Sequence, residues 1–230
     1  MKLTRAVVAI GCALFLSCAA VFTAPAPAAA VATLYLSDGV NPAVTITDGS
    51  PQDGCALAGC VMFNGSIGVW VLSVSTGVSN SPIPHIDLNS IDMSSGAGTS
   101  TLTIKFGDTD FSLGAGPHTV SLGSAIGGTT DGSVTWQAGL NSSNLNPITS
   151  GCCDQLGGLH GTSSNPFSQS NLDTFSADGP FALELAVTIT HGPGLQLTSF
   201  DYQGRVPGPA TFLLLGVGLL GAGAVKRRIA

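Results

Sequence analysis

The sequence has few charged residues, and positive charge is the scarcest. Only 9% of the 230 residues are Asp, Glu, Lys or Arg, whereas an ordinary soluble domain has about a quarter. Between the two chain ends, Lys105 and Arg205 stand against all 13 acidic residues, so this part has a net charge of 2 − 13 = −11. Nucleic acid and anionic lipid surfaces repel such a body. We therefore exclude nucleic acid as a partner.

Familiar enzyme motifs are also missing. The sequence has no G-x-S-x-G elbow, no H-E-x-x-H zinc motif and no phosphate-binding loop. A hydrolase would need a histidine beside a nucleophile and a carboxylate, and Glu184 is the one glutamate. We predict no catalytic residue, no cofactor and no metal site, and keep a secreted hydrolase as the least favoured hypothesis. The histidines that could serve it are His85, His118, His160 and His191.

Residues 1–30 have the pattern of a secretory signal peptide. Two basic residues precede the apolar run Ala6–Val21, and small residues follow as far as Ala30. The small-residue run favours cleavage after Ala28 or Ala30 over an uncleaved anchor. A loose match to a lipoprotein signal ending at Cys18 is the weaker alternative. We therefore expect export through the inner membrane, with a signal helix preceding the body.

The C-terminus has the pattern of a membrane anchor. Ala210–Val225 is a run of 16 uncharged, mostly apolar residues, followed directly by Lys226, Arg227 and Arg228. As a helix the run would be about 24 Å long, short for a bilayer core of about 30 Å unless flanking residues extend it. A basic cluster after such a span stays in the cytoplasm. The body would then lie outside.

The tail also resembles a known sorting signal. Val206-Pro207-Gly208-Pro209-Ala-Thr, a Leu/Gly-rich span and the basic cluster resemble, in order and spacing, the PEP-CTERM signal, which begins Val-Pro-Glu-Pro-Ala-Thr. Gly208 departs from the family pattern, which usually has Glu there. The resemblance implies an exosortase-like processing enzyme in a Gram-negative-type bacterium. It also implies association with exopolysaccharide or biofilm at the cell surface, but it names no activity for the body.

Residues 31–205 have the alternation of β-strands. In Thr101–Phe106 and Phe181–Thr190, apolar side chains recur at every second position. Ile67–Val74 is apolar on both faces and is expected to be one central strand, whereas residues 141–176 show little strand pattern and are expected to be a long loop. Asp-Gly and Gly-Gly pairs mark turns between the strands. We predict an all-β, two-sheet sandwich, jelly-roll-like, between the signal helix and the C-terminal transmembrane helix.

Four cysteines remain in the body, and in an oxidising compartment they are disulfide candidates: Cys55, Cys60, Cys152 and Cys153. A bond between the adjacent Cys152 and Cys153 would be strained, because neighbouring Cα atoms are only about 3.8 Å apart. We therefore expect at least one bridge from the first pair to the second. A metal site that includes His160 fits no common zinc spacing.

Two further groups of residues are candidate ligand sites. Asp108 and Asp110 could offer oxygens to Ca²⁺, but two acids are few, and a turn with solvated acids is preferred. Trp70 and Trp136 could stack on sugars, but both lie in strand patterns, and core packing is preferred. The favoured function is a non-catalytic structural or interaction protein of the cell surface or matrix. A carbohydrate- or Ca²⁺-binding sandwich is the alternative.

Overall fold

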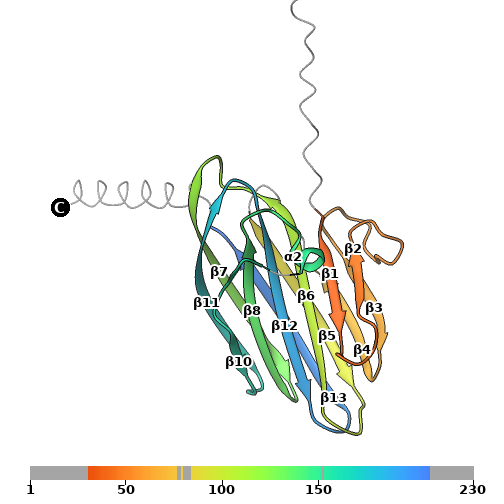
Figure 1. The fold of residues 1–230 in the computed structure, drawn as a ribbon. Coiled ribbons are helices and arrows are strands. Elements are labelled where there is room, and N and C mark those ends of the chain that lie inside the picture. The colour runs from red at the N-terminus through yellow and green to blue at the C-terminus, as the bar shows by residue number, and fades with distance from the viewer. Residues whose placement is uncertain (1–30, 77–78, 80–83, 152, 208–230) are drawn as a thin grey trace, which may run out of the picture.

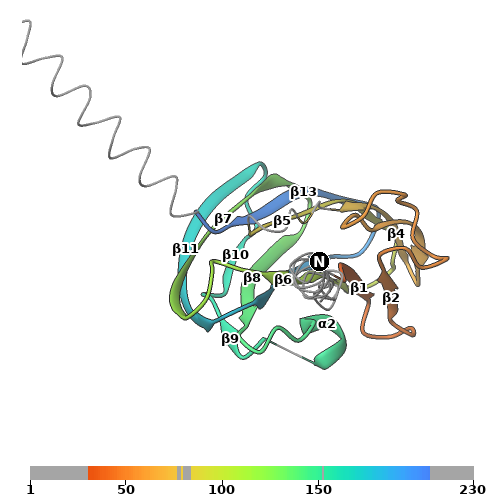
Figure 2. The same cartoon turned by 90° about the horizontal axis from the view of Figure 1, so that it is seen from above.

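The structure is a computed structural model that describes residues 31–76, 79, 84–151 and 153–207. Thirteen β-strands fill most of this part of the chain and build two antiparallel sheets that face each other (Figures 1 and 2). The prediction of an all-β sandwich is therefore confirmed.

The front sheet in Figure 1, which we call sheet A, has seven strands. Six run in the order β10-β8-β12-β6-β1-β2, and β9 also pairs with β8. Their bounds are β1 Thr33–Ser37, β2 Val44–Thr47, β6 Ser100–Phe111, β8 Ser133–Asn141, β9 Gln155–Leu156, β10 His160–Thr162 and β12 Phe181–His191.

The rear sheet, sheet B, has six strands in the order β11-β7-β13-β5-β4-β3. From β5 onward the chain crosses between the sheets repeatedly, so that β6, β8 and β12 lie in sheet A and β5, β7, β11 and β13 in sheet B. The bounds are β3 Met62–Ile67, β4 Trp70–Thr76, β5 His85–Ser94, β7 Pro117–Thr130, β11 Phe167–Asp178 and β13 Gln196–Arg205.

The core lies between the sheets and follows from the period-two pattern. In β6, Leu102, Ile104 and Phe106 are fully buried, while the alternate positions Thr101, Thr103 and Lys105 face outward. β12 repeats the pattern beside it and pairs with both β6 and β8. Trp70 and Trp136 are 0% and 1% exposed. The preference for core packing of both tryptophans is confirmed.

Two predicted elements are wrong. Ile67–Val74 is not one strand, because β3 ends at Ile67 and β4 begins at Trp70. Between them Gly68 has φ of +56°, a left-handed conformation that glycine adopts freely and that here makes a tight hairpin. Residues 141–176 are also not one long loop, since they hold β9, β10 and most of the edge strand β11.

The expected cysteine bridge is likewise corrected. Cys55 and Cys60 bond to each other, with Cα atoms 5.9 Å apart, within the usual range of about 4.4–6.8 Å. The expectation assumed that all four cysteines would pair, in which case a Cys55–Cys60 bond would leave the strained Cys152–Cys153 bond as the other bridge. The turn between them brings them together instead: Cys60 N donates to Leu57 O at 3.1 Å. Cys153 is buried, and Cys152 lies outside the described residues.

The chain ends carry the predicted sorting segments, most of which lie outside the described residues. The signal peptide 1–30, Gly208, Pro209, the apolar run and the basic cluster Lys226–Arg228 belong to that part. Val206 is buried and donates its N–H to the carbonyl of Pro84 at 2.9 Å, and half-buried Pro207 follows it. Within the described ranges, no helix has the length and apolar character needed to cross a bilayer.

Candidate functional site

Of the four histidines, His191 comes nearest to a catalytic arrangement. Its Nδ1 is 2.8 Å from Ser94 Oγ, and its Nε2 is 2.8 Å from Thr198 Oγ1. The ring also lies on Trp70, with centroids 4.6 Å apart. His191 and Ser94 are 0% and 1% exposed, so a substrate cannot reach them. This group ties β12 of sheet A to β5 and β13 of sheet B.

The other three histidines lie far apart on the fold. His85, at the start of β5, has a pKa lowered by burial and by the charge of Arg205. His160 stacks on Trp136 with centroids 6.0 Å apart, and His118 borders a hollow described below. Across residues 31–207, as far as they are described, no histidine hydrogen-bonds a carboxylate, and no three His, Cys, Asp or Glu side chains are grouped to hold a metal ion.

The two acids weighed as a Ca²⁺ site do not lie in a solvated turn. Asp108 is fully buried within β6, and its carboxylate accepts hydrogen bonds from the Ser79 hydroxyl and the Thr109 N–H. Burial raises its pKa. Asp110 instead pairs with Asn144, which accepts from its N–H and donates to its carboxylate, both at 2.7 Å. The two carboxylates therefore hold loops together, and the preference for solvated acids is wrong for Asp108.

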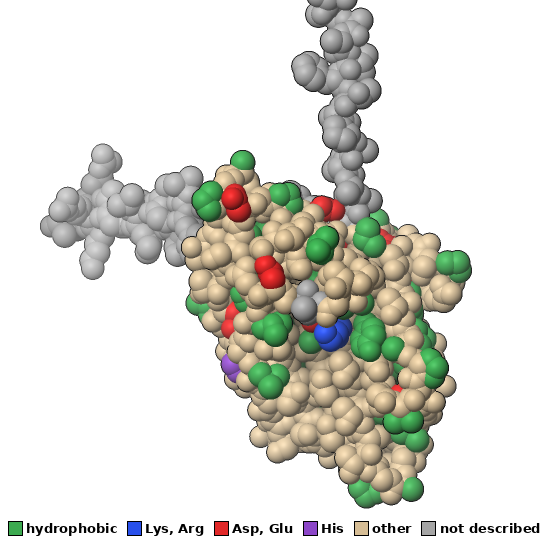
Figure 3. All heavy atoms as spheres, in the orientation of Figure 1, with side chains coloured by type: hydrophobic (Ala, Val, Ile, Leu, Met, Phe, Trp, Pro, Cys, Tyr) green, Lys and Arg blue, Asp and Glu red, His purple; other side chains and the backbone are tan. Residues whose placement is uncertain are grey.

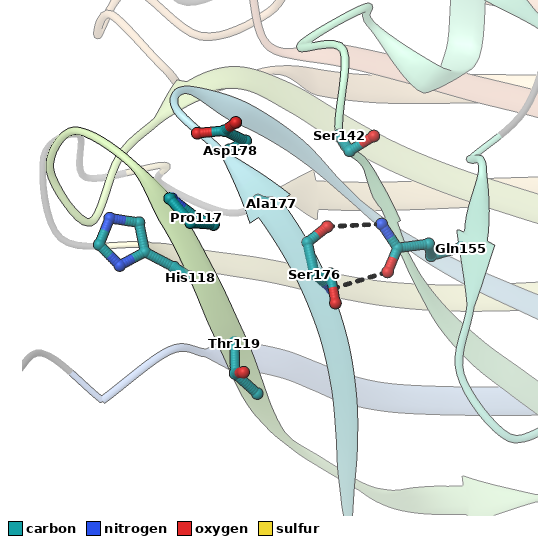
Figure 4. A pocket seen from close by; sticks show the side chains of 8 residues that line it. All are labelled: Pro117, His118, Thr119, Ser142, Gln155, Ser176, Ala177 and Asp178. Atoms are coloured by element: carbon teal, nitrogen blue, oxygen red, sulfur yellow. Dashed lines mark hydrogen bonds between the residues drawn. The ribbon is translucent and has the colours of Figure 1, made fainter.

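A hollow of about 450 Å³ opens at the edge formed by β7, β9 and β11. Figure 4 shows Gln155 crossing this edge: its Nε2 donates to Ser176 O at 2.6 Å, and Ser176 N donates to its Oε1 at 2.7 Å. The ring of His118 points away from Gln155. At the rim, both the N–H and the hydroxyl of Ser142 bond Asp154. Because Gln155 and Ser142 are paired within the protein, we assign them to closing the sandwich edge.

The outer face of sheet A offers a different kind of surface. In its lower part the outward positions carry hydroxyls on neighbouring strands. Thr103 of β6 pairs with Thr188 of β12, which pairs with Thr135 of β8, and the first two hydroxyls are 3.4 Å apart. In the next row Thr101, Thr190 and Ser133 lie side by side. We call these six residues the hydroxyl face.

The hydroxyl face is broad and uncharged. In Figure 3 the lower front of the molecule shows no acidic or basic side chain over β6, β12 and β8. Neighbouring strands lie about 4.8 Å apart and alternate residues of one strand about 6.8 Å apart, so hydroxyl-bearing residues recur in both directions. Each threonine also presents a methyl group. The surface can therefore donate and accept hydrogen bonds and make apolar contacts at regular spacing.

Above the hydroxyl face, a smaller hollow of about 240 Å³ is lined by Tyr35, Lys105 and three residues at α2, Pro147–Ser150. Tyr35 and Lys105 are direct neighbours on β1 and β6. The Lys105 ammonium is 3.2 Å from a carboxylate oxygen of Glu184, which is 5% exposed. This hollow adds an aromatic ring and a partly neutralised cation to the same face of sheet A.

Sequence reasoning missed the hydroxyl face because a face is a property of the assembled sheet. The T-x-T pairs at Thr101 and Thr188 are visible in the sequence, but only the pairing of β6, β12 and β8 brings them into rows. An available signal was the scarcity of charge in strands otherwise typical of an exposed sheet surface, since residues 133–141 and 185–190 contain no charged residue.

Comparison with known proteins gives limited information. No family model matches the chain, and no curated protein matches it. Solved structures with some similarity include the K1 cleaved adhesin domain of Lys-gingipain from Porphyromonas gingivalis W83, at 8% identity over 63% of this chain and 95% of that one, with a TM-score of 0.31. TmCBM61 in complex with β-1,4-galactotriose matches at 8% identity over 61% and 91%, with a TM-score of 0.26. The C-terminal CBM6 of the laminarinase LamC from Zobellia galactanivorans matches at 8% identity over 56% and 98%, with a TM-score of 0.25.

Proposed function

We propose that this protein is an exported, non-catalytic surface or matrix protein whose sandwich binds neutral polysaccharide on the outer face of sheet A. The observation that carries the proposal is the uncharged hydroxyl face in a body that is otherwise strongly acidic. The strand order, β5-β13-β7-β11 against β6-β12-β8-β10, supports the finer assignment of a jelly roll, which is built from two Greek keys.

The chemistry of the face favours a neutral glycan over other polymers. Sugar rings alternate hydroxyl groups with C–H surface, and a threonine array presents hydroxyls and methyls in the same way. With a net charge of −11 between the chain ends, anionic polymers are repelled at long range, whereas neutral chains are not. Tyr35 at the upper end of the face supplies an aromatic ring of the kind that packs on sugars.

Removing three hydroxyls tests this function. Thr103→Ala, Thr135→Ala and Thr188→Ala in one protein should weaken binding to neutral polysaccharide at least tenfold, because the upper of the two rows of the face loses its hydrogen-bonding groups. Affinity electrophoresis in gels containing mixed-linkage β-glucan, xylan or galactomannan measures the effect, with alginate as the anionic comparison.

The matched control removes three hydroxyls from the outer face of sheet B, as Ser121→Ala, Thr129→Ala and Ser199→Ala. This protein should bind as the wild type does. Equal retardation of wild type and both triple variants in all gels would contradict the proposal. A purely structural role for the body would then be preferred.

Export and sorting are the second part of the proposal, supported by the signal-like N-terminus and by the resemblance of residues 206–228 to a PEP-CTERM signal. In a host with exosortase, the intact mass should correspond to a start near Val31 and a C-terminus near Pro207–Pro209. Without the enzyme, the tail should remain and anchor the protein in the membrane. A tail retained in both hosts would mean that Gly208 prevents processing or that the resemblance to a sorting signal is misleading, and either result would overturn the proposed sorting.

A further inference from the structure

A third hollow, of about 420 Å³, lies at the lower end of the sandwich in Figure 1. It is lined by residues of the β1–β2, β3–β4 and β5–β6 connections, together with the ends of β4 and β6. Its volume falls within the range of small-ligand sites, about 300–1,000 Å³. We call it the end pocket.

The sequence builds the end pocket through close contact between two of its loops. The Asp38 carboxylate accepts hydrogen bonds from the N–H groups of Val40 and Asn41, at 3.0 and 2.7 Å, and from the Asn41 amide at 2.7 Å. This pair packs onto Gly68, where an added Cβ would overlap the Asp38 carboxylate and lie 2.6 Å from Asn41 Nδ2. Glycine at position 68 therefore allows the β3–β4 hairpin to meet the β1–β2 loop.

The electrostatics of the end pocket disfavour an anionic ligand. Slight burial tends to raise the pKa of Asp38, but the hydrogen bonds from Asn41 and Val40 outweigh it and lower the pKa. The carboxylate is therefore ionised at neutral pH. The lining residues include no Lys, Arg or His, so the pocket presents one uncompensated negative charge.

Two lining residues also have hydrogen-bonding atoms without partners. Nε1 of Trp70 and Oγ of Ser100 are buried, and neither makes a hydrogen bond with the described protein. An unmet buried donor costs roughly 1–3 kcal/mol; both atoms are covered in this structure, so a ligand oxygen would gain this energy only where the neighbouring pocket loops shift to expose them. Val40 and Val69, which are 88% and 42% exposed, add apolar wall. The pocket thus combines donors, an acceptor and apolar surface.

A neutral sugar ring matches this combination, since it carries acceptor oxygens, donor hydroxyls and an apolar face. The end pocket is also continuous with the hydroxyl face: Thr101 lines the pocket and belongs to the lower row of the face. We propose that the end pocket holds one terminal or side-branch sugar ring of the glycan whose chain lies on the hydroxyl face. This inference rests on the proposed function and specifies where recognition of a single ring occurs.

Gly98→Tyr tests the inference. An added Cβ at Gly98 has no atom within 4 Å and no positive φ to oppose it, so the new ring should enter the pocket without distorting the loop. Cello-, xylo- and mannohexaose are the probes, titrated against Trp fluorescence excited at 295 nm. Trp70 lines the pocket and Trp136 does not, so a Trp136→Phe background assigns the signal. The variant should bind the best hexasaccharide at least tenfold more weakly and lose the Trp70 response.

The control is Gly192→Tyr, where an added Cβ meets only the flexible side chain of Gln196 at 3.5 Å; it should bind normally. Polymer binding should persist in Gly98→Tyr, because the hydroxyl face is intact. Hexasaccharide affinity equal to wild type in Gly98→Tyr would overturn the pocket assignment alone. Failure of every hexasaccharide and polymer to bind wild-type protein would overturn the proposed function, and the pocket assignment with it.

Discussion

Gly128→Ala is expected to destabilise the protein by about 3 kcal/mol or more, although it adds only a single methyl group. Gly128 lies in β7 between Phe167 of β11 and Phe200 of β13. A Cβ at this position would overlap the carbonyl oxygen of Ser199 and lie 2.9 Å from the Cα of Phe200. Both are backbone atoms in the neighbouring strand, so a side-chain rotation cannot relieve the overlap.

The adjacent Gly127 provides a matched control. A Cβ there meets its nearest atom, the carbonyl oxygen of Phe167, at 3.7 Å, an ordinary van der Waals distance. Gly127→Ala should therefore change the free energy of unfolding by less than about 1 kcal/mol. Urea denaturation followed by Trp fluorescence measures both variants. Similar unfolding midpoints for the two would show that β13 moves away from β7 easily, contrary to this packing.

Asp92→Asn is expected to stabilise the protein at pH 8 but not at pH 4. Asp92 is fully buried on the inner face of β5; Ser90 Oγ donates to its Oδ1 at 2.6 Å, and Oδ2 is buried without a partner. Burial raises the pKa of this carboxyl and the hydrogen bond from Ser90 lowers it. Burial has the larger effect, and the pKa is about 7. Asparagine has the same shape and carries no charge.

The direction in which stability changes with pH follows from the number of protons that the folded and unfolded states bind. Between pH 4 and 7 the unfolded state has released the Asp92 proton while the folded state retains it, so stability falls as the pH rises. Above pH 7 both states are ionised, and the full penalty, about 4 kcal/mol at most, remains. Asp87 also lowers stability as the pH rises, because burial and the charge of Asp201 raise its pKa to about 6.

The measurement is the free energy of unfolding of wild type and Asp92→Asn from pH 4 to 8. Subtracting the two curves removes the contributions of Asp87 and of His191, which both proteins share. The outward-facing Ser199→Ala serves as the control and should give a flat difference, because it removes no titrating group. A flat difference for Asp92→Asn as well would mean that the folded protein does not retain this proton.

Strand prediction from the sequence succeeded where one face of a strand is uniformly apolar. β12 is the clearest case, since Leu183, Leu185, Val187 and Ile189 all enter the core. The prediction failed at β11 because its inward positions in mid-strand hold Gln169, Asn171 and Asp173. These side chains lie at an open edge of the sandwich. Gly158 N donates to Asp173 at 2.9 Å there, in place of an apolar contact.

Less of the candidate site could be predicted. Hydroxyl residues at alternate positions of a strand are common, and only the register of three strands distant in sequence joins Thr103, Thr135 and Thr188. The end pocket depends on a contact between loops, and the glycine that permits it, Gly68, was interpreted as part of a continuous strand. The cysteine expectation failed for a related reason, because local turn geometry decided the pairing.

The placement of the chain ends gives the molecule a polarity. The register puts the start of β1 beside the end of β6 and the end of β13 beside the start of β5, both at the upper end in Figure 1, whereas the end pocket is at the lower end. Three residues, 207 to 209, separate the buried Val206 from the apolar run, and fully extended they reach about 10 Å. If that run anchors the protein before processing, as proposed, the tether joins the sandwich at the end opposite the end pocket.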